Sequence, residues 1–305
     1  MKKFFIIIAI GIVVLIGWYF FFKPYDYQVM FSTPTSKGTV FEGLKKWQEN
    51  FDRKKDSSIA ITNTNPFESF TQQLHVKDSL ITMRWELSSV NDSVTEVKLF
   101  VKDENNSVAN KVDVITGDAT IKEIALKKVQ NFRSGFKSHI QEFKIDSVSL
   151  GETPSFFCIY KTIHTTVDRK AFEMMQTNPQ IMEFLNEHQL QLIHKPFTQF
   201  TKYNKNNDSI TFNFCFPIQK TDSLPTLINS LKYGETKRKK ALKAIFHGNY
   251  VISDHAWYTL FDYANNHDIA VNELPLEIYF NDPHMGGKEL GWKAEIYMPL
   301  KDQED

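Results

Sequence analysis

The sequence predicts an α+β protein in three parts: an N-terminal transmembrane helix, a domain that combines an antiparallel sheet with one long helix, and a domain built from a duplicated strand-helix-strand-strand unit. A charge-free apolar run opens the chain, alternating segments precede a long amphipathic stretch, and two similar stretches lie in the C-terminal half. The predicted parts are residues 1–23, 24–146 and 150–301. A chain of 305 residues is long enough for an anchor and two domains of ordinary size.

Composition favours folded domains and argues against nucleic acid as a partner. Hydrophobic residues make up 42% of the chain and aromatic residues 14%, which is enough apolar surface for sizeable cores. The 36 Lys and Arg residues balance 36 Asp and Glu residues, so the protein has no long-range positive field to attract nucleic acid. Cys158 and Cys215 each lie in an apolar run and do not form a CxxC pair, so we expect buried, inert thiols.

The opening run, residues 4–22, contains no charged side chain and has the length of a helix that crosses the hydrocarbon core of a bilayer. Its apolar residues favour insertion by roughly 4–8 kcal/mol. Aromatic residues lead directly into Lys23 and Pro24, unlike the small residues of a signal-peptide cleavage site, so an uncleaved anchor is predicted. The alternative is a buried helix of a soluble protein, which would normally show a polar face.

The charges that flank the run predict its orientation. Lys2, Lys3 and the terminal amine outweigh the single Lys23. By the positive-inside bias, the N-terminus is expected in the cytoplasm and the globular part outside the cytoplasm, on the cell membrane.

The first domain is predicted from two kinds of periodicity. Residues 25–32 alternate as a strand does, and residues 38–50 carry apolar side chains at helical spacing. A long helix is then predicted from a cap at Asp118, with one apolar face from Ile121 to Phe143. Between the two helices, turn-formers separate β-rich runs that predict an antiparallel meander over residues 58–62, 70–76, 80–87 and 94–101.

This order of elements resembles the helix-grip order of the START-like (SRPBCC) superfamily. The resemblance is one of pattern, and it implies a cavity between sheet and long helix that either holds an apolar ligand or is filled by side chains. His75 and His139 are isolated in the sequence, and the acidic residues mostly occupy turns or helix surfaces. We therefore expect solvated or packing roles for these residues and no catalytic set.

An internal repeat predicts the second domain. The stretch FLNEHQLQLIHKPF from Phe184 recurs as YANNHDIAVNELPL from Tyr263, and FNFCFPI from Phe212 recurs as AEIYMPL from Ala294. The matched residues are Asn186, His188, Leu190, Pro196 and Pro217 against Asn265, His267, Ile269, Pro275 and Pro299.

The repeats, about 154–219 and 241–301, each have the pattern strand, helix, strand, strand, with the first helix broken at Asn178-Pro179. One copy cannot cover its own sheet, so the two copies should pack together and form a groove along their pseudo-twofold junction.

The second repeat carries the segments FHGNYVISDHAWYTLFDYANN, LPLEIYFNDP and GWKAEIYMPL. These resemble the gyrase-inhibitor-like family, which includes the effector-binding domains of bacterial transcription regulators. The resemblance covers both repeats and is more specific in the second. It implies a domain that binds small, often aromatic and cationic molecules in a hydrophobic pocket with an acidic residue. No room remains for a helix-turn-helix beside the anchor and the first domain, so the regulator function is not implied.

Two glutamates, Glu277 and Glu295, are the candidates for the acidic residue of such a pocket. Glu277 and Tyr279 share one face of a strand, and Glu295 and Tyr297 share one face of the next, because side chains alternate along a strand. A hairpin loop centred on Gly286 would place Glu277 roughly opposite Glu295. Facing carboxylates repel, so either one is protonated or a cation lies near both.

The candidate aromatic walls are Tyr250, Trp257, Tyr258 and Trp292, whose cation–π contacts would contribute about 0.5–2 kcal/mol each. The predicted ligand site consists of Tyr250, Trp257 and Trp292 with the two glutamates and their neighbouring tyrosines. The alternative is that both glutamates face solvent and the aromatic side chains form core. Histidines 247, 255, 267 and 284 lack metal-ligand spacing, so no metal and no cofactor is predicted.

Taken together, the sequence predicts a membrane-anchored protein that captures or senses a hydrophobic, cationic small molecule in the groove between the repeats. One alternative is a hydrolase of small reactive ligands, with Glu277 as general base and Tyr279 as hydrogen-bond donor. Another is a structural envelope protein whose groove is packed shut. The sequence contains no recognisable nucleophile elbow, triad or metal set, so the hydrolase rests on family analogy.

Overall fold

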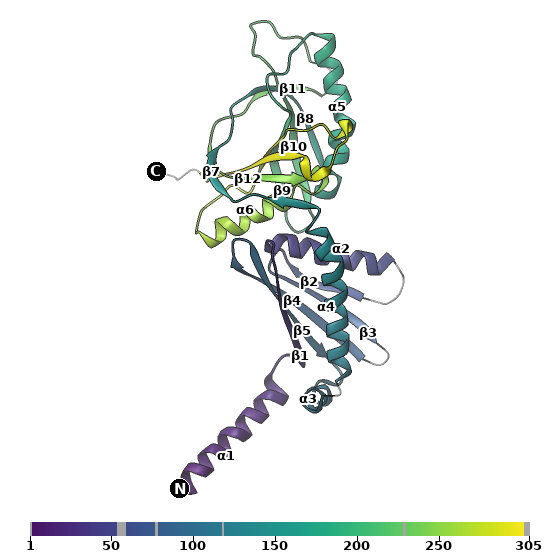
Figure 1. Cartoon of the computed structure of the whole chain (residues 1–305), viewed down its shortest axis with the longest axis vertical. Helices are drawn as coiled ribbons and strands as arrows, with labels where there is room; N and C mark the ends of the chain where they lie inside the picture. Colours follow the sequence, from purple (N-terminus) through teal and green to yellow (C-terminus); the bar gives the residue numbers. More distant parts are fainter. Residues whose placement is uncertain (1, 54–58, 77–78, 118, 228–229, 302–305) are drawn as a thin grey trace. The chain divides into compact units, whose positions relative to one another are not determined.

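The computed structural model shows an α+β protein with an N-terminal apolar helix and two antiparallel sheets (Figure 1). The chain divides into two compact units: unit 1, residues 1–90 and 94–137, and unit 2, residues 91–93 and 138–305. The structure describes residues 2–53, 59–76, 79–117, 119–227 and 230–301.

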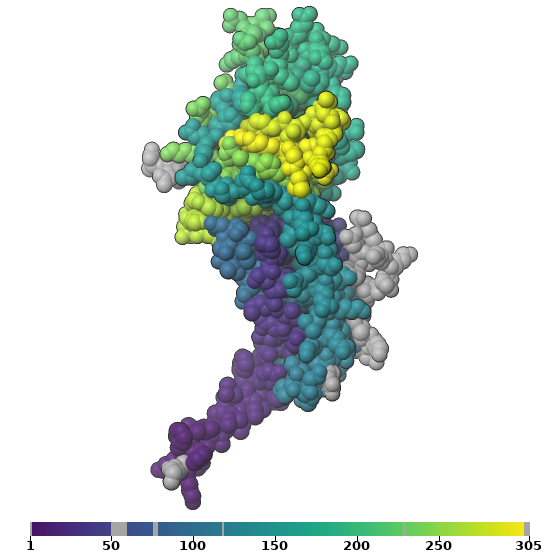
Figure 2. Space-filling model, in the orientation of Figure 1, coloured from purple at the N-terminus to yellow at the C-terminus, as the bar shows by residue number. Residues whose placement is uncertain are grey.

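The apolar N-terminal run is helical throughout. It comprises α1 (Lys2–Gly17) and a π-helical turn, η1 (Trp18–Phe22). Together they span 21 residues with a mean hydropathy of 2.7, long and apolar enough to cross a membrane. None of their side chains is buried, and Figure 2 shows α1 uncovered along its length.

Unit 1 consists of a five-stranded sheet that packs against the helices α2 and α4. Its sheet has the strand order β1-β5-β4-β3-β2. Every second residue of β5 is buried, as expected for a strand with one face on a core. The elements are β1 (Tyr27–Thr33), α2 (Lys37–Arg53), β2 (Ile59–Asn65), β3 (Ser69–Val76), β4 (Ser79–Asn91), β5 (Val94–Asp103), α3 (Ser107–Thr116) and α4 (Thr120–His139).

Aromatic rings from both helices and the sheet meet in the core of unit 1. Trp47 on α2, Trp85 on β4 and Phe132 on α4 lie with ring centroids 5.8–6.1 Å apart. Phe136 stacks on Phe132 at 5.0 Å, one helical turn further along α4. These contacts hold the long helix α4 against one face of the sheet.

Two details of the predicted first domain need correction, and one falls outside the described residues. Helix α4 ends at His139, and Phe143 lies instead in a short strand, β6 (Phe143–Ile145), of the second sheet. The sequence did not predict α3, which is only ten residues long. Asp118, the predicted cap, lies outside the described residues.

Unit 2 is built on a nine-stranded sheet with the order β11-β8-β10-β9-β13-β14-β12-β6, in which β7 also pairs with β12. Its further elements are β7 (Ser149–Glu152), β8 (Phe157–Thr166), η2 (Val167–Arg169), α5 (Lys170–Glu187), β9 (Phe197–Asn204), β10 (Ser209–Pro217), β11 (Lys232–Glu235), β12 (Lys240–Gly248), η3 (Tyr250–Ile252), α6 (His255–Asn266), β13 (Leu276–Tyr279), η4 (Pro283–Met285), η5 (Glu289–Gly291) and β14 (Lys293–Pro299).

The two repeats have the same succession of elements: strand, 3-10 turn, helix, strand, strand. Pro196 and Pro275 both precede the strand that follows the helix, and Pro217 and Pro299 both end the last strand. The paired prolines therefore fall on like elements, as the repeat predicts. Gln189 and Asp268, just after the two helices, both adopt a positive φ, of 54° and 52°.

Helix α5 differs from the prediction because it continues through Pro179. Proline removes one backbone N–H and usually breaks or kinks a helix. Pro179 lies on the exposed side of α5, where water can solvate the carbonyl group that loses its partner. The helix therefore tolerates the proline without ending there.

The pseudo-twofold axis between the repeats passes through the middle of the sheet. Strands β9 and β13 are antiparallel, and Thr198 pairs with Glu277. These two residues are 79 positions apart (277 − 198), the same spacing as Pro196 and Pro275 (275 − 196), so they are repeat equivalents. Glu277 thus lies beside the axis, with the neutral Thr198 as its counterpart.

Candidate ligand-binding site

Unit 2 contains a cavity of about 470 Å³ next to α5. Its wall comes from one face of α5, strand β10, the η3 turn, the end of β13 and the loop that leads to β14. Most of the lining side chains are apolar: Ala171, Met174, Met175, Met182, Leu192, Pro196, Phe214, Phe216, Tyr250, Val251, Tyr279, Phe280, Pro283 and Trp292.

Helix α5 presents three methionines to the cavity. Met174, Met175 and Met182 follow Ala171 at steps of three, four and eleven residues, which places them on one side of a helix. Another stripe of α5, which includes Thr177 and Ile181, is buried in the protein core. Methionine side chains are flexible and polarisable, so this wall can adapt to ligands of different shape.

The ring of Tyr250 lines the cavity, and its hydroxyl group forms hydrogen bonds with the protein backbone. The hydroxyl donates a hydrogen bond to the carbonyl oxygen of Lys293 at 2.8 Å and accepts one from the backbone N–H of Asn281 at 3.1 Å. Burial raises the pKa of Tyr250 to about 12. Its ring centroid lies 4.9 Å from that of Tyr279 and 5.7 Å from that of Trp292, so the three rings form one apolar wall.

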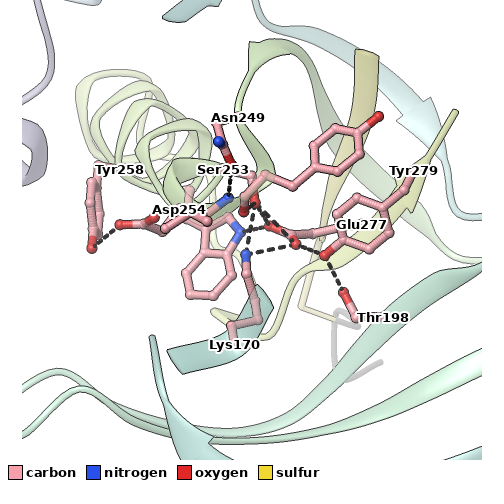
Figure 3. Close-up of polar contacts among 11 residues, drawn as sticks. Lys170, Thr198, Asn249, Ser253, Asp254, Tyr258, Glu277 and Tyr279 are labelled. Carbon is pink, nitrogen blue, oxygen red and sulfur yellow. Dashed lines mark hydrogen bonds and ion pairs between the residues drawn. The ribbon is translucent and has the colours of Figure 1, made fainter. Parts of the chain in front are cut away.

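Glu277 lies behind this wall and is fully buried, with 0% exposure. Its Oε2 accepts a hydrogen bond from Lys170 Nζ at 2.9 Å and another from the Tyr279 hydroxyl group (Figure 3). Its Oε1 accepts a hydrogen bond from Trp257 Nε1 and lies 3.1 Å from Ser253 Oγ. Both carboxylate oxygens therefore have partners inside the protein.

Lys170 is the counter-ion of Glu277 and is also fully buried. Its Nζ donates a hydrogen bond to Ser253 Oγ at 2.7 Å and lies 4.7 Å from the ring centroid of Trp257. A buried charge is tolerated when it is paired and hydrogen-bonded, and both conditions hold here. Lys170 directly follows η2 and Ser253 directly follows η3, so equivalent positions of the two repeats meet at this site.

The burial of Tyr279, together with its negative neighbour Glu277, raises the pKa of its hydroxyl group well above 10. The Thr198 hydroxyl lies 3.1 Å from the Tyr279 oxygen. Tyr279 is thus a neutral hydrogen-bond donor. One side of its ring lines the cavity, and its hydroxyl group belongs to the buried network.

The predicted pair of facing glutamates does not form. Glu277 pairs with Ile296, and Glu295 pairs with Ile278, so the two carboxylates lie on opposite faces of the sheet. The loop between the strands contains η4 and η5, and it shifts the pairing by one residue from the register predicted for a loop centred on Gly286. A shift of one residue reverses the face of every side chain.

Glu295 has its own partners on the other face. Lys293 Nζ lies 2.9 Å and Lys243 Nζ 3.0 Å from its oxygens, and the Tyr297 hydroxyl donates a hydrogen bond at 2.7 Å. Burial by itself would raise the pKa of Glu295, but the hydrogen bonds from Lys293, Tyr297 and Lys243 outweigh it and lower the pKa to about 2. No cation is needed between the two glutamates.

The predicted site residues therefore separate into three groups. Tyr250, Tyr279 and Trp292 line the cavity. Trp257 is buried with Glu277 behind the wall. Glu295 and Tyr297 lie on the far face of the sheet. Ligand binding by any of them stays a prediction. Among the residues that the structure describes, no group of three or more His, Cys, Asp or Glu side chains is arranged to hold a metal ion.

Sequence reasoning missed Lys170 and the methionine face. The signal for Lys170 was present: it lies in phase with the buried residues Thr177, Ile181 and Phe184 of α5, at steps of seven, eleven and fourteen. A lysine on an apolar stripe needs a buried partner.

No family model matches this chain, and no curated protein matches it. Solved structures with similar folds include the C-terminal domain of EcmrR, at 16% identity and a TM-score of 0.45, covering 51% of this chain and 98% of that one. An integron cassette protein from the mobile metagenome of Vibrio cholerae has 13% identity and a TM-score of 0.32, covering 52% and 99%. The di-domain ARO/CYC protein BexL from the BE-7585A biosynthetic pathway has 9% identity and a TM-score of 0.28, covering 90% and 85%. Similarity this low carries no inference about ligand or activity.

Proposed function

We propose that unit 2 binds a hydrophobic, uncharged small molecule in the cavity beside α5, and that α1 tethers the protein to a membrane. The observation that carries the proposal is the cavity wall, built from methionine side chains and aromatic rings. Cavities of about 470 Å³ with mostly apolar walls and a few polar groups are typical of small-molecule sites.

The charges around the cavity favour an uncharged ligand over the predicted cation. Lys170 neutralises Glu277, so the carboxylate of Glu277 behind the wall already has its counter-ion. The formal charges of the lining residues Lys195 and Asp282 cancel. A cation that entered would lose hydration, and the acidic lining residue Asp282 is offset by the basic lining residue Lys195, whereas a neutral molecule loses little hydration.

We further propose that unit 2 is an effector-binding module of the gyrase-inhibitor-like kind and that unit 1 is a START-like helix-grip domain. Support for the first comes from two strand-helix-strand-strand repeats around a pseudo-twofold axis. Support for the second comes from a five-stranded antiparallel sheet that packs on the long helix α4. Because aromatic rings fill space between α4 and the sheet, we assign ligand binding to unit 2.

The geometry gives little support to a hydrolase. A general base must reach the proton that it removes, directly or through one water molecule. Glu277 has no exposed surface, and both of its oxygens are occupied by protein donors. We therefore propose a receptor or carrier that holds its ligand unchanged.

The tether follows from the length and composition of α1. We propose that α1 and η1 cross the cell membrane with the N-terminus in the cytoplasm, because Lys2 and Lys3 flank that end. Both units would then lie outside the cytoplasm.

Isothermal titration of residues 24–305 with triphenylphosphine oxide, a neutral aromatic molecule, tests the cavity. We expect one site per chain. Ala171→Trp fills the cavity and should weaken binding at least about tenfold, equivalent to about 1.4 kcal/mol. Phe172→Trp is the matched control, because Phe172 is an exposed neighbour on α5 that does not line the cavity. Equal affinity in the two variants would place the ligand elsewhere.

A further inference from the structure

The topology of unit 1 brings helix α3 to the point where the chain leaves α1. Four residues separate η1 from β1, and Tyr27 at the start of β1 pairs with Val101 near the end of β5. Because β1 and β5 are antiparallel, the end of β5 lies at the same edge of the sheet as the start of β1. Three residues separate β5 from α3, so α3 lies beside the end of the apolar helix (Figure 1).

A buried lysine fixes α3 to that end. Lys111 Nζ donates hydrogen bonds to the carbonyl oxygens of Phe20 at 3.2 Å and Lys23 at 2.8 Å. The last carbonyl groups of a helix lack partners within the helix, and an ammonium group satisfies them. Asp26 completes the junction, because it accepts a hydrogen bond from the Ser107 hydroxyl group and lies 3.9 Å from Lys111 Nζ.

The outer side of α3 is apolar and exposed. Val108, Val112 and Ile115 are 47%, 44% and 65% exposed, and their spacing of four and three residues places them on one side of the helix. A polar outer side would be normal for a surface helix in water. In this protein the apolar side of α3 lies next to the C-terminal end of the predicted membrane span, at η1.

We propose that α3 lies in the membrane interface, with Val108, Val112 and Ile115 inserted among the lipid headgroups and the upper acyl chains. This rests on the proposed membrane tether, because α1 supplies the bilayer beside which α3 lies. Lipid is the occupant that the position favours, since Lys111 joins α3 to the last carbonyl groups of the spanning helix. Short apolar helix faces bind the boundary between headgroups and acyl chains in this way. Unit 1 would then touch the bilayer at two places, which would fix its orientation to the membrane.

The test uses the full chain in phosphatidylcholine vesicles, with Cys158 and Cys215 replaced by Ala and one new cysteine labelled with the fluorophore NBD. Val112→Cys places the label on the apolar side of α3. Asp113→Cys is the matched control, because Asp113 is exposed on the same helix but projects away from that side. Lipids with a nitroxide on an upper acyl carbon should quench the label at position 112 at least about twice as strongly as at position 113.

A third label, at Ile8→Cys in α1, separates the two proposals. If lipid nitroxides quench position 8 while positions 112 and 113 behave alike and are open to aqueous iodide, the tether stands and the α3 contact is wrong. If position 112 is protected from iodide but not quenched by nitroxide lipids, protein covers this surface and the inference is overturned. If position 8 escapes quenching, the tether fails whatever α3 does, and quenching at position 112 alone would still support the α3 contact.

Discussion

At the scale of single residues, the pairing of Lys170 with Glu277 decides which ligands the cavity can favour. The sequence pointed to Glu277 as a free carboxylate that selects cations. In the structure a lysine from the other repeat already fills the place of that cation. The protein thus contains its own positive charge behind a wall of aromatic rings, and the ligand meets a mostly apolar surface.

The pair makes a prediction about stability. Lys170→Met and Glu277→Leu should each lower the free energy of unfolding by about 3–5 kcal/mol, because each leaves one buried charge without its partner. The double variant should be more stable than the sum of the single losses predicts, by about 2 kcal/mol or more. Urea unfolding of the four proteins measures this, and additive losses would mean that the two charges do not interact.

Glu295 predicts a dependence of stability on acid. Its pKa is about 2 in the folded protein and about 4.5 when unfolded, so its carboxylate stabilises the fold above pH 4.5. That contribution is lost as the pH falls from about 4.5 towards 2. The free energy of unfolding should therefore fall less steeply over this range in Glu295→Gln than in the original protein. Glu187→Gln, at an exposed position, is the control, and equal slopes for all three proteins would contradict the assignment.

At the scale of helices and strands, periodicity predicted most of the fold. Alternation identified β1, β-rich runs between turn-formers identified β2, β3, β4 and β5, and helical spacing identified α2 and most of α4. These patterns are local, since each element shows its own buried face in its own sequence. The paired prolines 196 and 275 likewise marked equivalent strands, because both repeats need the same turn before the strand that follows the helix.

The site was harder to predict because it depends on contacts between distant residues. Lys170 and Glu277 are 107 positions apart, and nothing local to either residue indicates the other. The pairing of β13 with β14 depended on the conformation of the intervening loop, and an error of one residue placed Glu295 on the wrong face. Helices and strands can be predicted from the periodicity of their own residues. A binding site can be predicted only when the register between paired strands is also known.

Pro179 gives a prediction for helix α5. Pro179→Ala restores a backbone N–H that can reach the carbonyl oxygen of Met175, and should raise the free energy of unfolding by about 1–3 kcal/mol. Gln176→Ala, at an exposed position of the same helix, should change it by less than about 0.5 kcal/mol. Urea unfolding measures both. A loss of stability in Pro179→Ala would mean that the proline supports the shape of α5.

At the scale of the whole molecule, duplication supplies a symmetric scaffold that carries an asymmetric site. Thr198 and Glu277 are repeat equivalents beside the pseudo-twofold axis, and Lys170 and Ser253 occupy equivalent positions after the two 3-10 turns. One member of each pair is charged and the other carries a hydroxyl group. The charged side chains of Lys170 and Glu277 therefore meet across the pseudo-twofold axis. The cavity lies next to α5, the helix of the first repeat.

The tether makes a prediction about topology. Alkaline phosphatase, which is active only outside the bacterial cytoplasm, should be active when fused after residue 305. Moving Lys2 and Lys3 to positions after residue 23 reverses the charge bias and should lower that activity. High activity of a cytoplasmic reporter at the same place would reverse the proposed orientation while leaving the span in place.

The central claim, that the cavity takes an uncharged ligand because Lys170 neutralises Glu277, is tested most directly by comparing two molecules of nearly the same shape. Triphenylphosphine oxide is neutral and methyltriphenylphosphonium is a cation. Calorimetric titration of residues 24–305 should give at least about tenfold tighter binding of the neutral molecule, and Lys170→Met should narrow or reverse that ratio. Tighter binding of the phosphonium ion by the original protein would contradict the claim.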